Sequence, residues 1–139
     1  GHEFMSRGDD SGTHKKEIAL WKAYDIAYEG EDWHLETGQG MGTTIRVADE
    51  KQAYTLADRG TYLSLKDQIT LRPLLEGADM LLNPYGVIQV DPERHPDVNA
   101  DLARDFSDWL LEEETQQMIA DFRKNGEQLF KPLRGECLG

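Results

Sequence analysis

Apolar residues along positions 14–28 recur at intervals of three and four, the spacing that places side chains on one face of a helix. The recurring positions are Ile18, Leu20, Trp21, Tyr24 and Ala27. The preceding residues 6–13 are polar and interrupted by glycine. The pattern therefore predicts a loop that leads into an amphipathic helix, with Gly30 as the point where the helix ends.

Residues 33–42 are irregular and rich in glycine, which predicts a tight turn. Thr43 or Thr44 is expected to cap the helix that follows, and this helix is expected to run through Tyr54. The alternating glycines invite comparison with a nucleotide-binding loop, but neither a P-loop lysine nor a preceding apolar strand accompanies them. A nucleotide site is therefore not favoured.

The middle of the chain contains the segments with the strongest β character. Residues 54–57 predict a short strand, and after a turn Thr61 is expected to cap a brief helix through Asp67. Residues 69–75 and 80–90 are rich in branched apolar residues and predict two further strands. Asn83-Pro84 interrupts the second of these, so that strand is expected to bend or to change sheets there.

Two amphipathic helices are predicted after a proline-containing turn at residues 91–96. The first apolar stripe consists of Leu102, Phe106, Trp109 and Leu110. The second consists of Met118, Ile119 and Phe122. Strands that alternate with helices in this way predict the α/β fold class.

Composition and charge narrow the range of functions. With 139 residues the chain fits one domain with a real core, but not two full lobes. Its net charge of −12 disfavours binding to nucleic acid or to anionic membranes. No apolar run is long enough to span a bilayer, no signal peptide is recognised, and Cys137 as the single cysteine excludes an internal disulfide. Residues 1–3 are interpreted as a cloning remnant, and Phe4-Met5 as either the end of a buried strand or further vector-derived residues.

The candidate chemistry is concentrated in the loop before the first predicted helix. Gly8 and Gly12 allow the backbone to turn sharply and to approach a ligand, while Ser11 and Thr13 are good N-cap residues with hydroxyl donors. The first amides of the helix lack intrahelical partners and lie at the positive end of the helix dipole. Together with the guanidinium of Arg7, this pattern predicts an oxyanion-binding site.

The roles of Arg7 and Asp9 in this loop have alternatives. Arg7 could donate to the anion, form an ordinary ion pair with Asp9 or Asp10, or do both. If Asp9 faces Arg7, the site offers donors only and suits a fully deprotonated anion such as tungstate, molybdate or sulfate. If Asp9 faces the ligand, it can accept the proton that phosphate keeps near neutral pH.

The string Ser6-Arg-Gly-Asp-Asp-Ser-Gly-Thr-His14 resembles the anion loop of the tungstate-binding proteins of ABC importers. Its central part, Arg7 to Thr13, is also similar to the anion loop of periplasmic phosphate-binding proteins. Further motifs match the tungstate-binding family in order and spacing. They are Thr37 to Gly42, Ala53 to Leu56, Asp58 to Tyr62, Leu82 to Tyr85, and Leu129-Phe130.

This resemblance implies a periplasmic binding protein-like lobe with a mixed sheet flanked by helices. Residues 4–90 would form the second lobe of a two-lobed protein. Residues 91–139 would form a helical return segment that packs on the first lobe, which is expected to be missing from this chain. The implied oxyanion ligands are Ser6, Arg7, Ser11, Gly12 and Thr13. The implied supporting or further ligand-binding positions are Asp9, Gly40, Met41, Gly42 and Thr43.

The same resemblance implies transport and not catalysis, with no cofactor and a bound oxyanion as the ligand. It implies a membrane permease as the partner and a periplasmic or other extracytoplasmic location. Without the first lobe, the apolar face of the return segment is expected to be covered by a symmetric homodimer or by a segment swap.

Other function classes account for smaller parts of the loop. Asp10, His14 and Glu17 would share a helix face and could hold a divalent metal if the helix began by Asp10, although the Ser-Gly-Thr cap indicates a later start. A hydrolase built on Ser11 and His14 cannot easily reach triad geometry within so few residues. Adhesion through the Arg-Gly-Asp tripeptide rests on a match that is frequent by chance. A ligand-sensing half of a regulator is a further alternative, but no basic helix-turn-helix segment accompanies it.

Overall fold

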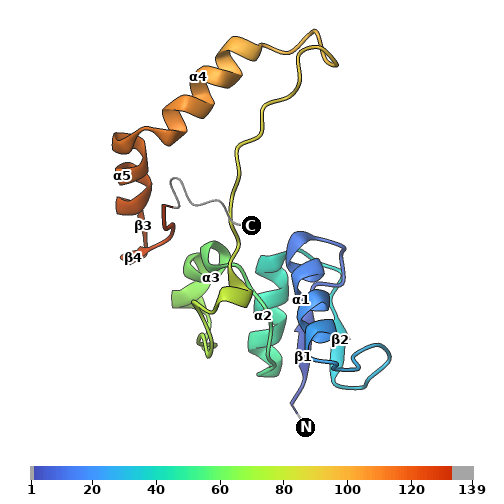
Figure 1. Cartoon of the computed structure of the whole chain (residues 1–139). Coiled ribbons are helices and arrows are strands. Elements are labelled where there is room, and N and C mark those ends of the chain that lie inside the picture. The colour runs from blue at the N-terminus through green and yellow to red at the C-terminus, as the bar shows by residue number, and fades with distance from the viewer. Residues whose placement is uncertain (1, 133–139) are drawn as a thin grey trace. The chain divides into compact units, whose positions relative to one another are not determined.

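The structure is a computed structural model that describes residues 2–132. Cys137 therefore lies outside the described residues. The chain divides into two compact units, Gly1–Leu81 and Leu82–Gly139, whose elements are labelled in Figure 1. Across the described part of the chain, every helix is too short or too polar to cross a membrane.

A short parallel sheet forms the centre of the first unit. Strand β1 (Phe4–Ser6) pairs in parallel with β2 (His34–Glu36), with Phe4 opposite His34 and Ser6 opposite Glu36. On its other edge β1 takes a parallel bridge from Tyr54, whose carbonyl accepts the Met5 N–H at 2.7 Å. β1 is therefore the middle one of three short parallel segments.

The two faces of β1 are covered by different helices, because side chains alternate along a strand. Phe4 and Ser6 face α1 (Gly12–Ala23): the Phe4 ring meets the Trp21 ring at 4.9 Å, and Ser6 hydrogen-bonds Glu17. Met5 faces the other way and forms a buried cluster with Ala48 of α2 (Met41–Lys51) and with Ala53.

The rest of the first unit extends this core with short elements. Helix α3 (Arg59–Leu65) continues into the 3-10 helix η1 (Lys66–Gln68), and a second 3-10 helix, η2 (Asp79–Leu81), follows an irregular stretch. Leu65 packs with Met41 and Ile45 of α2 in a second buried cluster. Helix α2 therefore packs on β1 through the first cluster and on α3 through the second.

The second unit consists of two helices and a hairpin. Helix α4 (Ala100–Leu111) is followed by α5 (Glu113–Asp121), and β3 (Arg123–Lys124) pairs antiparallel with β4 (Glu127–Gln128). The hairpin turn is Asn125-Gly126, with φ of 50° and 77°. Asparagine and glycine are the residues that best tolerate the positive φ angles of such a turn.

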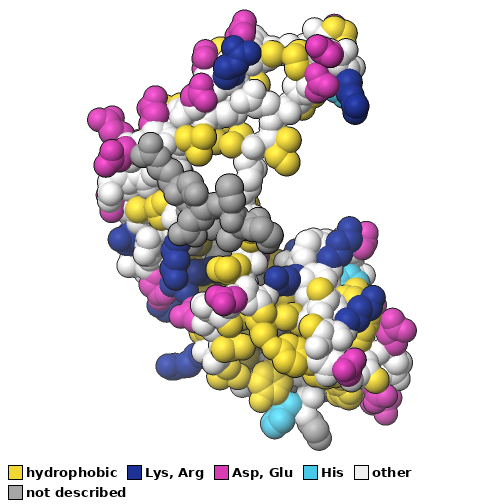
Figure 2. All heavy atoms as spheres, in the orientation of Figure 1, with side chains coloured by type: hydrophobic (Ala, Val, Ile, Leu, Met, Phe, Trp, Pro, Cys, Tyr) yellow, Lys and Arg dark blue, Asp and Glu magenta, His cyan; other side chains and the backbone are white. Residues whose placement is uncertain are grey.

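Helix α4 carries an apolar stripe that is largely accessible to solvent. Leu102, Phe106 and Trp109 are 63%, 56% and 43% exposed. Figure 2 shows apolar side chains along one side of α4 and charged side chains along the other. Both C-terminal helices predicted from the sequence are present, and the amphipathic pattern of the first is confirmed.

The two strands predicted at residues 69–75 and 80–90 are not present, which corrects the prediction from the sequence. Among the described residues these segments take an irregular path apart from η2, and no strand pairs with them. Branched apolar residues favour a strand only where a neighbouring strand supplies hydrogen bonds and a packing surface. Leu74 and Ile88 are instead 79% and 89% exposed.

Helix boundaries also differ from the prediction. α1 ends at Ala23, well before Gly30, because Asp25 adopts a left-handed backbone with φ of 52°. α2 begins at Met41 with Gly40 as its N-cap, so neither threonine that follows acts as the cap. α3 is capped by Asp58, whose carboxylate accepts the Thr61 N–H at 2.8 Å.

Two strand predictions need correction as well. β2 lies inside residues 33–42, which were expected to be irregular throughout. The strand expected at residues 54–57 is reduced to the single bridge at Tyr54. The sheet of the first unit is parallel, and the antiparallel pairing belongs to the separate hairpin of the second unit.

Candidate functional site

Two loops lie at the same edge of the sheet in the first unit. β1 ends at Ser6 and leads through residues 7–11 into α1, while β2 ends at Glu36 and leads through residues 37–40 into α2. Because β1 and β2 are parallel, their carboxyl ends are adjacent. This edge is where open α/β sheets commonly bind ligands, since it collects helix N-termini.

Thr37 and Thr44 join the two loops. Thr37 Oγ1 donates to the Ser6 carbonyl oxygen at 3.2 Å and lies 2.8 Å from Thr44 Oγ1. Thr44 is fully buried and also lies within hydrogen-bond distance, 3.2 Å, of the Gly40 carbonyl oxygen. The start of α2 is therefore tied to the end of β1 by side-chain hydroxyls.

Of the two predicted N-caps of α1, Ser11 is the cap and Thr13 lies inside the helix. Ser11 has an extended backbone and its Oγ accepts the His14 N–H at 3.3 Å. The Lys15 N–H closes the first helical turn on the Ser11 carbonyl at 2.9 Å. The amides of Gly12 and Thr13 belong to the first turn, where backbone geometry offers no intrahelical acceptor.

Arg7 and Asp9 form an ion pair within the loop. Asp9 Oδ2 accepts from Arg7 Nε at 3.1 Å and from Nη2 at 2.5 Å. The other carboxylate oxygen, Oδ1, accepts the Ser11 N–H at 3.3 Å. Asp9 therefore faces Arg7 and the loop backbone, which is the first of the two arrangements considered for this residue.

The pKa of Asp9 is lowered from 3.8 to about 2. Hydrogen bonding from the Ser11 side chain is the main cause; desolvation opposes it, and the hydrogen bonds from Arg7 and from the Ser11 backbone lower the pKa further. The carboxylate is thus ionised throughout the neutral and mildly acidic range. It acts as an acceptor for Arg7 and Ser11.

The backbone of this loop depends on left-handed conformations at two positions. Gly8 has φ of +61°, and a Cβ added there would lie 2.8 Å from Glu36 Cβ. Asp10 has φ of 56°, and its N–H donates to His14 Nδ1 at 3.0 Å. Gly8 is therefore required by both conformation and space, whereas Asp10 is held by the His14 ring.

Ser6 lies behind the loop and not at its surface. Its side chain is fully buried, its hydroxyl donates to Glu17 Oε2 at 2.8 Å, and its oxygen accepts the Gly8 N–H at 3.2 Å. Glu17 is also buried and takes hydrogen bonds at Oε1 from Trp21 Nε1 and from His34 Nε2. Ser6 thus supports the loop from below.

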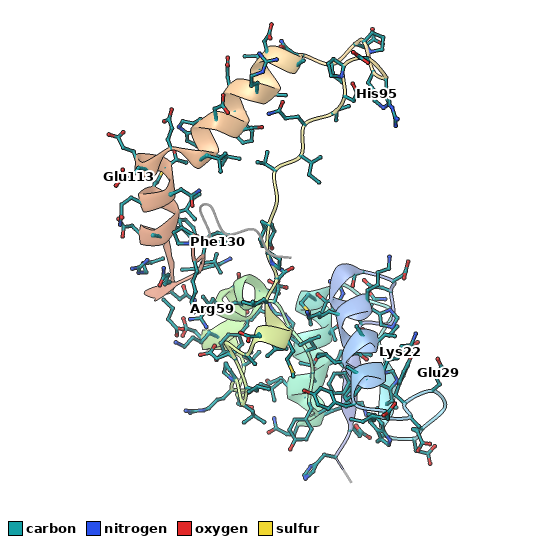
Figure 3. The ribbon with its side chains drawn as sticks, viewed as in Figure 1. Lys22, Glu29, Arg59, His95, Glu113 and Phe130 are labelled. Atoms are coloured by element: carbon teal, nitrogen blue, oxygen red, sulfur yellow. The ribbon has the colours of Figure 1, made fainter. Side chains whose placement is uncertain are left out.

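The second loop contributes the start of α2. Gly40 is the N-cap and Met41, Gly42 and Thr43 occupy the first turn. The Met41 side chain is buried in the core, so only its amide can face a ligand, while Thr43 is exposed. The far end of α1, with Lys22 in its last turn and Glu29 in the loop that follows, lies away from these helix N-termini (Figure 3).

The residues of the metal and hydrolase hypotheses do not converge. Asp10 pairs with Lys15, His14 Nδ1 accepts a backbone amide, and Glu17 points to the buried side of α1. Within residues 2–132 no cluster of three His, Cys, Asp or Glu side chains could hold a metal ion. The helix begins at Gly12, beyond Asp10, so the condition for a shared face is not met.

Other charged and hydroxyl groups of the loop also bind partners within the loop or the first turn of α1. The Ser11 hydroxyl bonds the backbone N–H of His14 and not its ring, which removes the basis for a Ser-His nucleophile. The two charged groups of the Arg-Gly-Asp tripeptide bind each other. Sequence analysis missed Thr37, Thr44 and His34 as structural partners of the loop; a strand prediction at residues 34–36 would have indicated His34 and Thr37, which lie in and directly after β2.

Residues 1–114 match the family model of the PBP superfamily domain, and the chain therefore belongs to this family. Among named relatives, the tungstate-binding protein TupA of Peptoclostridium acidaminophilum is 48% identical over 132 residues, which cover 94% of this chain and 46% of that protein. The chain thus spans about half the length of this relative.

Solved structures of tungstate-binding proteins are also similar to this chain. The tungstate binding protein TupA from Desulfovibrio alaskensis G20 is 43% identical and superposes with a TM-score of 0.80, over 96% of this chain and 55% of that one. The tungstate ABC transporter structure from Geobacter sulfurreducens is 45% identical with a TM-score of 0.74, over 88% of this chain and 51% of that one. The periplasmic binding protein-like α/β class expected from the sequence is therefore confirmed.

Proposed function

We propose that this chain supplies one half of a binding site for a tetrahedral oxyanion, that the anion is tungstate, and that the complete protein is the substrate-binding component of an ABC importer. The observation that carries the proposal is the pairing of Asp9 with Arg7. Because this pairing turns the nearest carboxylate inward, the loop presents N–H and O–H donors to a ligand. Two relatives named for tungstate binding, at 48% and 43% identity, support the choice of anion.

The proposed donors come from both loops. Arg7 keeps guanidinium N–H groups beyond the two that reach Asp9, and its side chain is 19% exposed. Further proposed donors are the amides of Gly12 and Thr13 and the hydroxyls of Thr13 and Ser11. The Ser11 hydroxyl rotates from Asp9 to donate to the anion. The amides of the Gly40–Thr43 turn complete the set. Ser6 acts from behind through Gly8.

The donor-only character separates tungstate from phosphate. Tungstate, molybdate and sulfate are fully deprotonated near neutral pH, so each of their oxygens can accept hydrogen bonds from the loop. Phosphate keeps a proton that needs an acceptor, and the Asp9 carboxylate is turned toward Arg7 and the Ser11 N–H. A protonated ligand would leave its own donor unpaired, which costs affinity. Molybdate and sulfate remain the closest competitors.

Affinity is proposed to arise from closure of two lobes around the anion. Residues 4–90 form the second lobe in this proposal, and the part of the protein outside this chain supplies the first. Closure excludes water and strengthens each donor, so an anion that contacts both lobes stabilises the closed form. Binding makes and breaks no covalent bond, and no cofactor is needed.

The apolar face of α4 is assigned to the contact with the first lobe. Residues 91–139 act as the return segment, and the exposed Leu102, Phe106 and Trp109 are its contact surface. In the chain alone, a homodimer or a segment swap covers this surface. The complete protein delivers its anion to a membrane permease and works in the periplasm or another extracytoplasmic compartment.

The test is a calorimetric titration of tungstate, molybdate, sulfate and phosphate. Each anion is titrated into this chain and into a longer form that restores the other half of the protein. The proposal predicts tight tungstate binding by the longer form, weaker binding or none by this chain, and no preference for phosphate. Preference for phosphate would overturn the donor-only assignment, and no heat from any of the four anions with the longer form would overturn oxyanion binding itself.

A further inference from the structure

The buried carboxylate of Glu17 lies directly behind the loop and is not explained by the proposed ligand contacts. Glu17 is 3% exposed, and three donors reach it: the Ser6 hydroxyl at 2.8 Å, the Trp21 indole N–H at 3.1 Å and His34 Nε2 at 2.8 Å. Burial of a carboxylate costs free energy unless hydrogen bonds replace its lost hydration, and these three donors supply such bonds.

The direction of the Ser6 hydroxyl is set by Glu17. A hydroxyl has one proton and two acceptor lone pairs. Since the proton of Ser6 goes to Glu17 Oε2, its oxygen is left to accept the Gly8 N–H at 3.2 Å. The carboxylate therefore acts on the loop through Ser6.

The Gly8 amide belongs to the peptide group that follows Arg7. On the carbonyl side of the same peptide, the Arg7 oxygen lies 3.5 Å from Thr37 Oγ1. The N–H side of this peptide is thus held by the Ser6 oxygen, while the Thr37 hydroxyl, whose proton goes to the Ser6 carbonyl, lies close to its carbonyl side. Fixing this plane fixes the direction in which the Arg7 side chain leaves the backbone.

We infer that Glu17 is a positioning residue of the oxyanion site, acting through Ser6 and Gly8 on Arg7. This inference rests on the proposed function for its consequence in binding, but its structural part stands on the contacts alone. His34 and Trp21 hold the carboxylate from the other oxygen and leave Oε2 for Ser6.

A glutamine at position 17 would reverse the polarity of this relay. The Trp21 indole can only donate, so the glutamine oxygen must stay on that side and its NH2 group must turn toward Ser6. The Ser6 proton then has no carboxylate to bind and competes with the Gly8 N–H in a site that is fully buried. Glu17→Gln is nearly equal in volume, so the core around it keeps its packing.

The experiment compares Glu17→Gln, Ser6→Ala and the double variant with Trp21→Phe as the matched control. Trp21→Phe removes a donor from Oε1 and leaves the Ser6 side of the carboxylate intact. Tungstate affinity is measured by calorimetry on the longer form, and exchange of the Gly8 amide hydrogen is measured by NMR on this chain. Thermal unfolding of each variant separates lost stability from lost positioning.

Glu17→Gln and Ser6→Ala are each expected to weaken tungstate binding about tenfold and to speed Gly8 amide exchange, and the double variant should be no worse than the stronger single one. Trp21→Phe should lower the melting temperature with little change in either readout. Unchanged Gly8 exchange in Glu17→Gln would overturn the positioning role, whatever the anion does. If the unsubstituted longer form binds no oxyanion, the proposed function fails while the exchange result still decides the role of Glu17.

Discussion

The Asp9 carboxylate takes two N–H groups of the Arg7 guanidinium on a single oxygen, Oδ2, at 3.1 Å from Nε and 2.5 Å from Nη2. Its other oxygen accepts the Ser11 N–H, so the acid is bound on both sides by its own loop. In the proposed site, Asp9 therefore holds Arg7 in place and does not compete with an anion for it.

The low pKa of Asp9 makes this pairing resistant to acid. Since its pKa is lowered from 3.8 to about 2 in the folded chain, the stability that the ionised form contributes is present above pH 3.8 and is lost as the pH falls toward 2. Titration of the Asp9 carboxyl followed by NMR should show a midpoint of about 2. As the pH falls from 3.8 toward 2, the unfolding free energies of the native chain and of Asp9→Asn should converge. An NMR midpoint for Asp9 at or above 3.8 would contradict the observed pairing.

Gly8→Ala should destabilise the loop by more than backbone conformation alone requires. A non-glycine residue with left-handed backbone costs about 1–2 kcal/mol, and here a Cβ would also lie 2.8 Å from Glu36 Cβ. Gly38→Ala is the matched control, because Gly38 has φ of +62° with nothing within 4 Å of its Cβ position. In chemical denaturation, Gly8→Ala should lose more unfolding free energy than Gly38→Ala. Equal losses would show that Glu36 does not crowd a Cβ at position 8.

Thr37→Val should loosen the connection between the two loops. Valine has nearly the shape of threonine, but it leaves the Ser6 carbonyl, the Gln39 N–H and the buried Thr44 hydroxyl each without one hydrogen-bond partner. The expected loss is about 1–3 kcal/mol of unfolding free energy. Thr43→Val, at an exposed position in the first turn of α2, should cost far less, and a similar loss from both variants would argue against the hydroxyl contacts.

The exposed stripe of α4 predicts self-association of this chain. Phe106→Glu places a charge on the apolar face and should shift the sedimentation coefficient toward that of a monomer. Arg104→Glu introduces a carboxylate at an exposed, charged position of the same helix and should leave association intact. A native chain that is monomeric at all accessible concentrations would contradict the proposed homodimer or segment swap.

Sequence reasoning succeeded where local chemistry decides the outcome. Ser11 and Thr13 were the two predicted caps of α1, on the basis of their position between a glycine-broken loop and an apolar stripe, and Ser11 is the cap. The same holds for α4 and α5, whose stripes repeat with helical spacing. Asn125-Gly126 was an equally local signal for the hairpin and was overlooked.

Sequence reasoning failed where an element depends on partners elsewhere. Residues 69–75 and 80–90 have strand composition but no neighbouring strand among the described residues, so composition alone misled. The role of Glu17 was also missed: its periodicity suggested a metal face with His14, whereas the parallel pairing of β1 with β2 brings Ser6 and His34 to it. Residue spacing along the chain does not predict contacts between Glu17 and residues of two separate strands.

The central claim is that Arg7 binds the oxyanion directly, and calorimetric tungstate titration of Arg7 variants of the longer form tests it. Charge-assisted hydrogen bonds contribute about 1.5–3 kcal/mol, so Arg7→Ala should weaken binding by about 10- to 100-fold. Arg7→Lys should recover only part of this loss, because lysine cannot bridge Asp9 and the anion with a planar fork. Arg94→Ala, which removes an exposed arginine paired with Asp91, is the control and should bind like the native protein. An affinity that is unchanged in Arg7→Ala would contradict the account.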